Sequence, residues 1–168
     1  GCQTAQQNKA LVETRLQLGL AYLARGELPA AQRNLQRALA LAPNDYRTHL
    51  AEARYQHQAG DDTLAGKYYH RALTLAPQNG YVLNNYGAFL CRLGQYDAAQ
   101  RHFIQAAEDS ANGTRADSVE NSGYCYLNAG QRERARDALS EAVTADPAKG
   151  MPMLADADRR FRKGNRQA

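Results

Sequence analysis

From Val12 onward, apolar and small residues recur with the period of an amphipathic helix, and the whole arrangement returns after 34 residues. Glycines follow the same spacing: intervals of 34, 34, 36 and 34 residues separate Gly26, Gly60, Gly94, Gly130 and Gly164. Glycine suits the position of positive φ at the C-terminal end of a helix. The pattern therefore predicts that each unit is a pair of helices joined by a tight turn at its glycine.

Each unit fits the tetratricopeptide pattern, in which W-x2-L-G-x2-Y on the first helix is followed by A-x3-F on the second. The clearest copy contains Tyr86, Gly87, Ala99 and Phe103. A small residue at the eighth position lets two helices approach closely, and stacked pairs then bury a continuous core. We predict an all-α fold, a right-handed superhelix of antiparallel helix pairs, with four repeats at residues 12–45, 46–79, 80–113 and 116–149.

Three segments depart from the repeat. Residues 1–8 are polar and lack apolar periodicity, so we expect a tether ahead of the first helix. Residues 110–114 predict a longer loop, followed by a capping box from Thr114 to Asp117 that starts the next helix. Residues 150–168 match the first helix of a fifth, truncated repeat, with Gly164 at the turn position.

The charge and the candidate chemistry argue for a protein-binding scaffold. The chain has 168 residues, and 21 basic against 17 acidic side chains give a net charge of +4 without an interleaved aromatic and basic platform, so we expect no nucleic-acid binding. No C-x-x-C or H-E-x-x-H motif, glycine elbow or phosphate-binding glycine loop occurs. We therefore expect a protein that is not an enzyme, with no metal, no cofactor and no small-molecule substrate.

Arrays of this kind usually bind partners on the concave face, which the first helix of each repeat lines. Asparagine side chains there can bond an extended backbone, and tyrosines supply flat contact area. The alternative is that these side chains are simply solvated. The predicted groove residues are Leu16, Leu20, Arg47, Leu50, Arg54, Tyr81, Asn84, Asn85, Ala88, Arg92 and Tyr124.

Three cysteines occur, at positions 2, 91 and 125. Cys91 and Cys125 fall on neighbouring first helices, whose spacing of about 10 Å allows facing Cβ atoms to reach disulfide geometry. We predict a bridge between them in an oxidising compartment; the alternative is two small buried apolar residues. Cys2 has no core around it, so any role it has must be chemical.

These features resemble the periplasmic type IV pilus biogenesis lipoproteins of the PilF/PilW family, the pilotins of the pilus secretin. The resemblance covers nearly the whole chain, although the loop at residues 109–115 differs from the family pattern. The asparagine-rich helix and the two matched cysteines are its specific part. It is carried by Gly1-Cys2 and by residues 84–91, 94–99, 121–125 and 146–147.

The resemblance implies a lipid anchor at Cys2, which places the chain in the bacterial periplasm on the inner leaflet of the outer membrane. It also implies a non-enzymatic factor that binds the pilus secretin and helps it reach that membrane and multimerise. The groove of the first three repeats would be the secretin contact. Two alternatives stay open: a generic periplasmic adaptor that recruits a protease or a cell-wall enzyme, and a cytosolic scaffold in which Cys2 has no role.

Overall fold

The computed structural model describes the backbone of residues 2–167 and the side chains of residues 4–156, 158 and 159. All regular secondary structure in this part of the chain is helical, as predicted. The chain divides into two compact units, Gly1–Pro77 and Gln78–Ala168. Each unit is built from pairs of helices.

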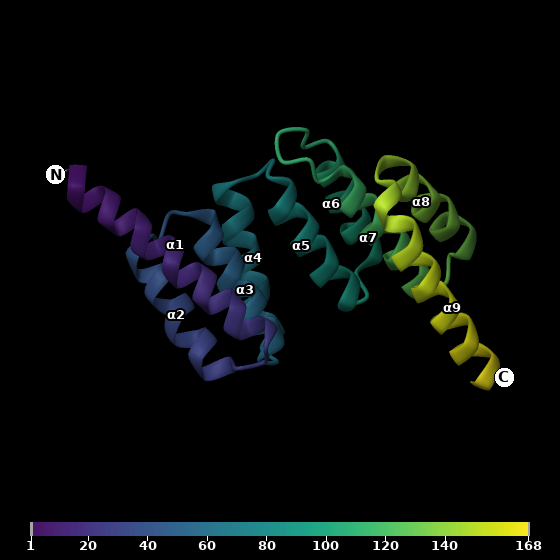
Figure 1. Ribbon diagram of the computed structural model, residues 1–168, viewed down its shortest axis with the longest axis horizontal. Helices are drawn as coiled ribbons and strands as arrows, with labels where there is room; N and C mark the ends of the chain where they lie inside the picture. The colour runs from purple at the N-terminus through teal and green to yellow at the C-terminus, as the bar shows by residue number, and fades with distance from the viewer. Residues whose placement is uncertain (1, 168) are drawn as a thin grey trace. The chain divides into compact units, whose positions relative to one another are not determined.

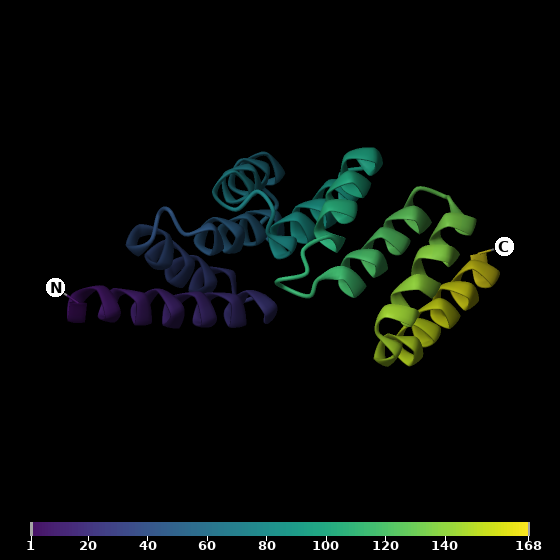
Figure 2. The same ribbon diagram turned by 90° about the horizontal axis from the view of Figure 1, so that it is seen from above.

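Unit 1 holds two such pairs, α1 with α2 and α3 with α4, and α2 also packs against α3 (Figure 1). The turned view shows α1 and α2 side by side along much of their length (Figure 2). The helices are α1 (Cys2–Ala24), α2 (Leu28–Leu41), α3 (Tyr46–Gln58) and α4 (Asp62–Leu75).

Unit 2 repeats the arrangement, with α5 against α6 and α7 against α8, while α6 and α5 both contact α7. A short 3-10 helix, η1, joins the second pair to a last helix. The elements are α5 (Gly80–Arg92), α6 (Tyr96–Ala107), α7 (Arg115–Asn128), α8 (Arg132–Ala145), η1 (Pro147–Lys149) and α9 (Gly150–Gln167).

The turn inside each pair has the same hydrogen bonds. At the first turn, Gly26 has φ 74°, and its N–H donates to the carbonyl of Leu23 at 3.0 Å. The N–H of Glu27 donates to the carbonyl of Tyr22 at 2.9 Å, which completes a Schellman motif. The same pair of bonds recurs at the three later turns, whose glycines also have positive φ: Gly60, Gly94 and Gly130.

In three of the four pairs, a glycine on the first helix faces a large side chain on the second, and the α3–α4 pair has Ala53 at this position. A Cβ added to Gly87 would lie 2.7 Å from the ring of Phe103, and one added to Gly123 would lie 2.7 Å from Leu139. Gly19 makes the corresponding close approach to Leu35. In these three pairs the glycine is required because the partner side chain fills the space that a methyl group would take.

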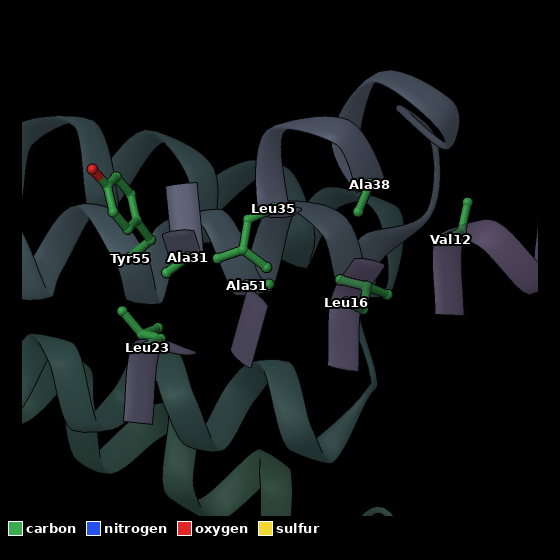
Figure 3. Close-up of a cluster of buried hydrophobic side chains, with 8 residues drawn as sticks. All are labelled: Val12, Leu16, Leu23, Ala31, Leu35, Ala38, Ala51 and Tyr55. Carbon is green, nitrogen blue, oxygen red and sulfur yellow. The ribbon is translucent and has the colours of Figure 1, made fainter. Parts of the chain in front are cut away.

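The core of unit 1 lies between its first three helices. Figure 3 shows the side chains that α1, α2 and α3 contribute to it, among them Leu35, which has no exposed surface. Leu16 and Ala51 belong to the same cluster and are 5% and 2% exposed. Unit 2 has its own cluster, in which Phe103 and both Cys91 and Cys125 are buried.

Unit 1 also buries a carboxyl group. Glu52 is 1% exposed, accepts one hydrogen bond at 3.1 Å from Gln56, and has a second oxygen without a partner. Burial raises the pKa of this carboxyl above its ordinary value, although Gln56 and the nearby His49 act in the opposite direction. The ring of His49 lies 6.0 Å from that of Tyr68 on α4, so this part of unit 1 is filled by large side chains.

Three expectations about the segments outside the repeats are wrong: the tether at residues 1–8, the turn at Gly164 and the capping box at Thr114. The predicted tether at residues 1–8 is helical from Cys2, because the alanine and the three glutamines in this segment favour a helix even without a buried face. Gly164 lies inside α9, since glycine permits a turn but does not force one.

Thr114 does not form the capping box. It precedes α7 as expected, but its hydroxyl donates to the carbonyl of Ala106 at 2.8 Å and makes no capping bond to α7. Thr114 is 2% exposed, so its side chain is packed under the end of α6. The predicted longer loop is confirmed, because seven residues, 108–114, separate α6 from α7, whereas four separate α2 from α3.

We expect Gly87→Ala to destabilise unit 2 by about 1–3 kcal/mol, because its methyl group would overlap the Phe103 ring. Urea unfolding followed by circular dichroism would measure the loss. Gly150→Ala is the matched control, since its Cβ would meet Val143 at an ordinary 3.5 Å. Equal stabilities of the two variants would contradict the close-packing argument.

We also expect Glu52→Gln to stabilise unit 1 at pH 7 by about 1–3 kcal/mol, because the charged carboxylate is buried with an unpaired oxygen. A raised folded-state pKa means that Glu52 favours folding when protonated, and that this contribution is lost as the pH rises through the folded-state pKa. The difference between variant and parent should therefore shrink towards pH 4. A difference independent of pH would show that Glu52 does not titrate in this way.

Candidate partner-binding surface

The predicted groove residues fall on the first helix of each pair. In unit 1 they lie on α1 and α3, and we call them the unit 1 face: Leu16, Leu20, Arg47, Leu50 and Arg54. In unit 2 they lie on α5 and α7, and we call them the unit 2 face: Tyr81, Asn84, Asn85, Ala88, Arg92 and Tyr124.

Leu16 does not belong to a binding surface. It is 5% exposed and lies in the core cluster of unit 1, against which Leu20 also packs. Leu16 is buried because α2 and α3 both contact α1 and cover the stripe that it shares with Val12. Leu50 is half-buried and Arg54 is exposed, so the available part of the unit 1 face lies mainly on α3.

Arg47 is held in place by two carboxylates. Its guanidinium donates to Asp45, the residue that caps the start of α3, at 2.9 Å and to Glu13 on α1 at 2.7 Å. These bonds raise the pKa of Arg47, with the hydrogen bond to Asp45 the largest cause. Burial alone would raise the pKa of Asp45, but the bonds from Arg47 hold it below its ordinary value. Arg47 therefore ties α3 to α1, and its charge is already balanced.

The unit 2 face has an amide pair at its centre. The side-chain N–H of Asn121 on α7 donates to the side-chain oxygen of Asn84 on α5 at 2.9 Å. Asn85 donates to the carbonyl of Tyr81 at 2.8 Å, one turn earlier. Each of these side chains is half-buried, apart from Tyr81, which is 49% exposed. Amides held in this way retain further donor and acceptor positions for a polypeptide backbone.

The remaining residues of this face differ in exposure. Arg92 is exposed at the C-terminal end of α5, whereas Ala88 and Tyr124 are half-buried. The hydroxyl of Tyr81 reaches the carbonyl of Asn112 at 3.4 Å, so this ring is anchored to the loop after α6. The face therefore combines an aromatic surface, amides and a cation, which suits a polypeptide ligand.

A lysine that sequence reasoning missed organises the acidic residues beside this face. Lys149 in η1 bonds Asp117 at 2.6 Å and Glu120 at 3.0 Å, both on α7. These partners, Asp117 first, raise the pKa of Lys149. The signal was its place two residues after Pro147, in the short 3-10 helix that follows α8.

The structure also brings Cys91 and Cys125 together as a disulfide between α5 and α7, with their Cα atoms 5.9 Å apart. Both are buried. Asn128 donates to the sulfur of Cys91 at 3.8 Å. The disulfide joins the two helices that carry the unit 2 face, so it restricts how that face can move.

The described part of the chain offers neither a candidate metal site nor a candidate membrane span. No group of three or more His, Cys, Asp or Glu side chains there could hold a metal ion. No helix among these residues is long and apolar enough to cross a membrane. The side chain of Cys2, the predicted lipidation site, lies outside the described residues.

Paired helices, glycine turns and small-to-large packing define a repeat scaffold. The tetratricopeptide repeat family matches residues 16–80 and 90–149, and the chain belongs to this family. The type IV pilus assembly protein PilF of Pseudomonas aeruginosa is 31% identical over 76% of this chain, and the chain spans 51% of its length. An uncharacterised protein of Haemophilus influenzae is 33% identical over 73% of this chain and 68% of its own.

Solved structures of type IV pilus proteins are also similar to this chain. The structure of Pseudomonas aeruginosa PilF matches with a TM-score of 0.81 and 27% identity, covering 95% of this chain and 72% of that one. PilW, described as a widely conserved type IV pilus biogenesis factor, matches with a TM-score of 0.75 and 25% identity, covering 90% and 75%. The chain is thus a tetratricopeptide repeat protein with type IV pilus biogenesis proteins among its relatives.

Loss of the disulfide should destabilise unit 2 by about 2–4 kcal/mol, because the bridge closes a loop across 34 residues. The measurement is urea unfolding of Cys91→Ser/Cys125→Ser against the parent, both carrying Cys2→Ser. Thiol titration of the unfolded Cys2→Ser parent, purified in air, should find no free thiol. Two free thiols would contradict the bridge, and so would an unchanged unfolding midpoint.

Proposed function

We propose that this protein is a non-enzymatic outer-membrane lipoprotein, a pilotin, that is required for type IV pilus biogenesis. It binds the pilus secretin and promotes the secretin's localisation in the outer membrane and its multimerisation. Its place is the periplasm, where acyl chains on Cys2 anchor it to the inner leaflet of the outer membrane.

The observation that carries the proposal is the likeness to PilF, which extends over three quarters of the sequence and nearly the whole structure. The likeness to PilW, a pilus biogenesis factor from a separate structure, points in the same direction. The disulfide supports an oxidising compartment, because such bonds persist in the periplasm and are rare in the cytosol.

The surface chemistry is consistent with binding a polypeptide. Arg54 on the unit 1 face and Arg92 on the unit 2 face are exposed, and Tyr81 offers an aromatic surface beside the Asn84–Asn121 pair. Arginine and tyrosine are enriched among the residues that dominate binding energy in interfaces. We therefore assign secretin binding to the accessible residues of the two faces.

Charge reversal tests this assignment. Arg54→Glu combined with Arg92→Glu should weaken secretin binding about tenfold or more and lower the fraction of heat-resistant secretin multimers in cells. Arg37→Glu with Arg71→Glu is the matched control, because both residues are exposed on second helices of their pairs, α2 and α4. Equal secretin binding by the two double variants would remove the faces from the proposal.

Deletion of the gene tests the function itself. We expect few secretin multimers and no pili without the protein, whereas unchanged multimers and normal pili would favour a periplasmic adaptor that recruits a protease or a cell-wall enzyme.

A Cys2→Ser variant should lose labelling by palmitate and should no longer be found in the outer-membrane fraction. Retained labelling would rule out Cys2 as the anchor.

A further inference from the structure

A hollow of about 510 Å³ lies among α6, α7 and α8 in unit 2. Its lining includes Val119, Ser122 and Tyr126 from α7, Ile104 from α6 and Ala138 from α8. The residues of α7 that line it are different from those on the unit 2 face. The hollow is therefore a separate feature of the molecule.

The hollow exists because small residues stand where unit 1 has large ones. Counting from the turn glycines Gly60 and Gly130, Val119 corresponds to His49, Ser122 to Glu52 and Ala138 to Tyr68. In unit 1 the rings of His49 and Tyr68 lie 6.0 Å apart beside the buried Glu52. In unit 2 the equivalent volume is left open.

An exposed isoleucine borders this open volume. Ile104 is 61% exposed, although the same repeat position holds a polar residue in the other three repeats: Gln36, His70 and Ser140. Tyr126 and Val119 extend the apolar surface into the hollow. Ser118, also in the lining, is fully buried and has a hydroxyl without a hydrogen-bond partner, which a carbonyl group could satisfy after a change of rotamer.

The rim of the hollow carries a bias towards negative charge. Arg115 is paired with Glu141 at 2.7 Å, and the guanidinium of Arg134 lies 6.0 Å from the centre of the Tyr126 ring. The carboxylates of Glu108, directly after α6, and of Asp137 on α8 also line the hollow. Within the part of the chain whose side chains are described, neither has an ion-pair partner.

We propose that this hollow is a second protein-interaction site, which takes an apolar side chain of a partner protein flanked by lysine or arginine. The apolar side chain fills the space beside Ile104 and Val119, and the basic residue pairs with Glu108 or Asp137. The volume of about 510 Å³ lies within the range of roughly 300–1,000 Å³ that is typical of ligand pockets.

Nuclear magnetic resonance of the whole ¹⁵N-labelled chain tests the site with two peptides, both acetylated and amidated. Lys-Leu-Ala-Leu-Lys should shift the amides of Ile104, Val119 and Ala138 in a saturable way. Glu-Leu-Ala-Leu-Glu should bind about tenfold more weakly, because its charges repel the rim. No saturable shift with the basic peptide, or equal binding of both peptides, would overturn the proposal.

Variants assign the effect to the hollow. Ala138→Tyr should abolish binding by filling the space, and Ile104→Gln should weaken it, whereas Leu93→Gln changes an exposed apolar residue outside the hollow and should leave it intact. Glu108→Gln with Asp137→Asn should remove the preference for the basic peptide. This double variant tests the site independently if Ala138→Tyr does not fold. Unchanged binding by Ile104→Gln and by the carboxylate variant would overturn the site, whatever the outcome with secretin.

Discussion

The close approach of two helices within each pair is the constraint on which the rest of the structure depends. At Gly87 the backbone of α5 meets the ring of Phe103 on α6 so closely that no Cβ fits. That contact sets how near the two helices lie, and the glycine turn between them sets their direction. The glycine turn recurs in all four pairs and the glycine contact in three of them, with Ala53 in the α3–α4 pair, so the pairs are built alike and their surfaces differ through the residues outside this contact.

Those outer residues decide what each unit can bind. On α3, Arg47 is engaged by Asp45 and Glu13, so its charge serves the attachment of α3 to α1 more than the surface. On α5 and α7, the amide pair and the disulfide join two helices while leaving Tyr81 and Arg92 accessible. A surface fixed by such links loses less conformational entropy when a partner binds.

Much of this was predictable from the sequence, because the repeat encodes local geometry. The glycines at positions 26, 60, 94 and 130 predicted turns, and the structure has positive φ at all four. Matching positions on neighbouring helices also indicated that Cys91 and Cys125 could meet, and the structure brings them together. In each case a residue type has a steric or covalent reason to stand at one place in the repeat.

Other features depend on which neighbour covers a residue, and a repeat pattern does not contain that information. Leu16 occupies a groove position in the pattern, yet α2 and α3 enclose it. Gly164 stands at the turn position, yet α9 continues through it. Lys149 lies outside the helices that carry the groove, so its bonds to Asp117 and Glu120 could not be read from helix positions alone.

The comparison of the two units explains why a shared scaffold can support different partners. His49 and Tyr68 fill a volume in unit 1 that Val119 and Ala138 leave open in unit 2, and the paired helices beneath are the same. Both pairs keep the turn glycine and a small residue at the close approach of the two helices, Ala53 in one and Gly123 in the other. Family membership therefore identifies the scaffold, whereas binding specificity has to be argued from the residues that differ between its repeats.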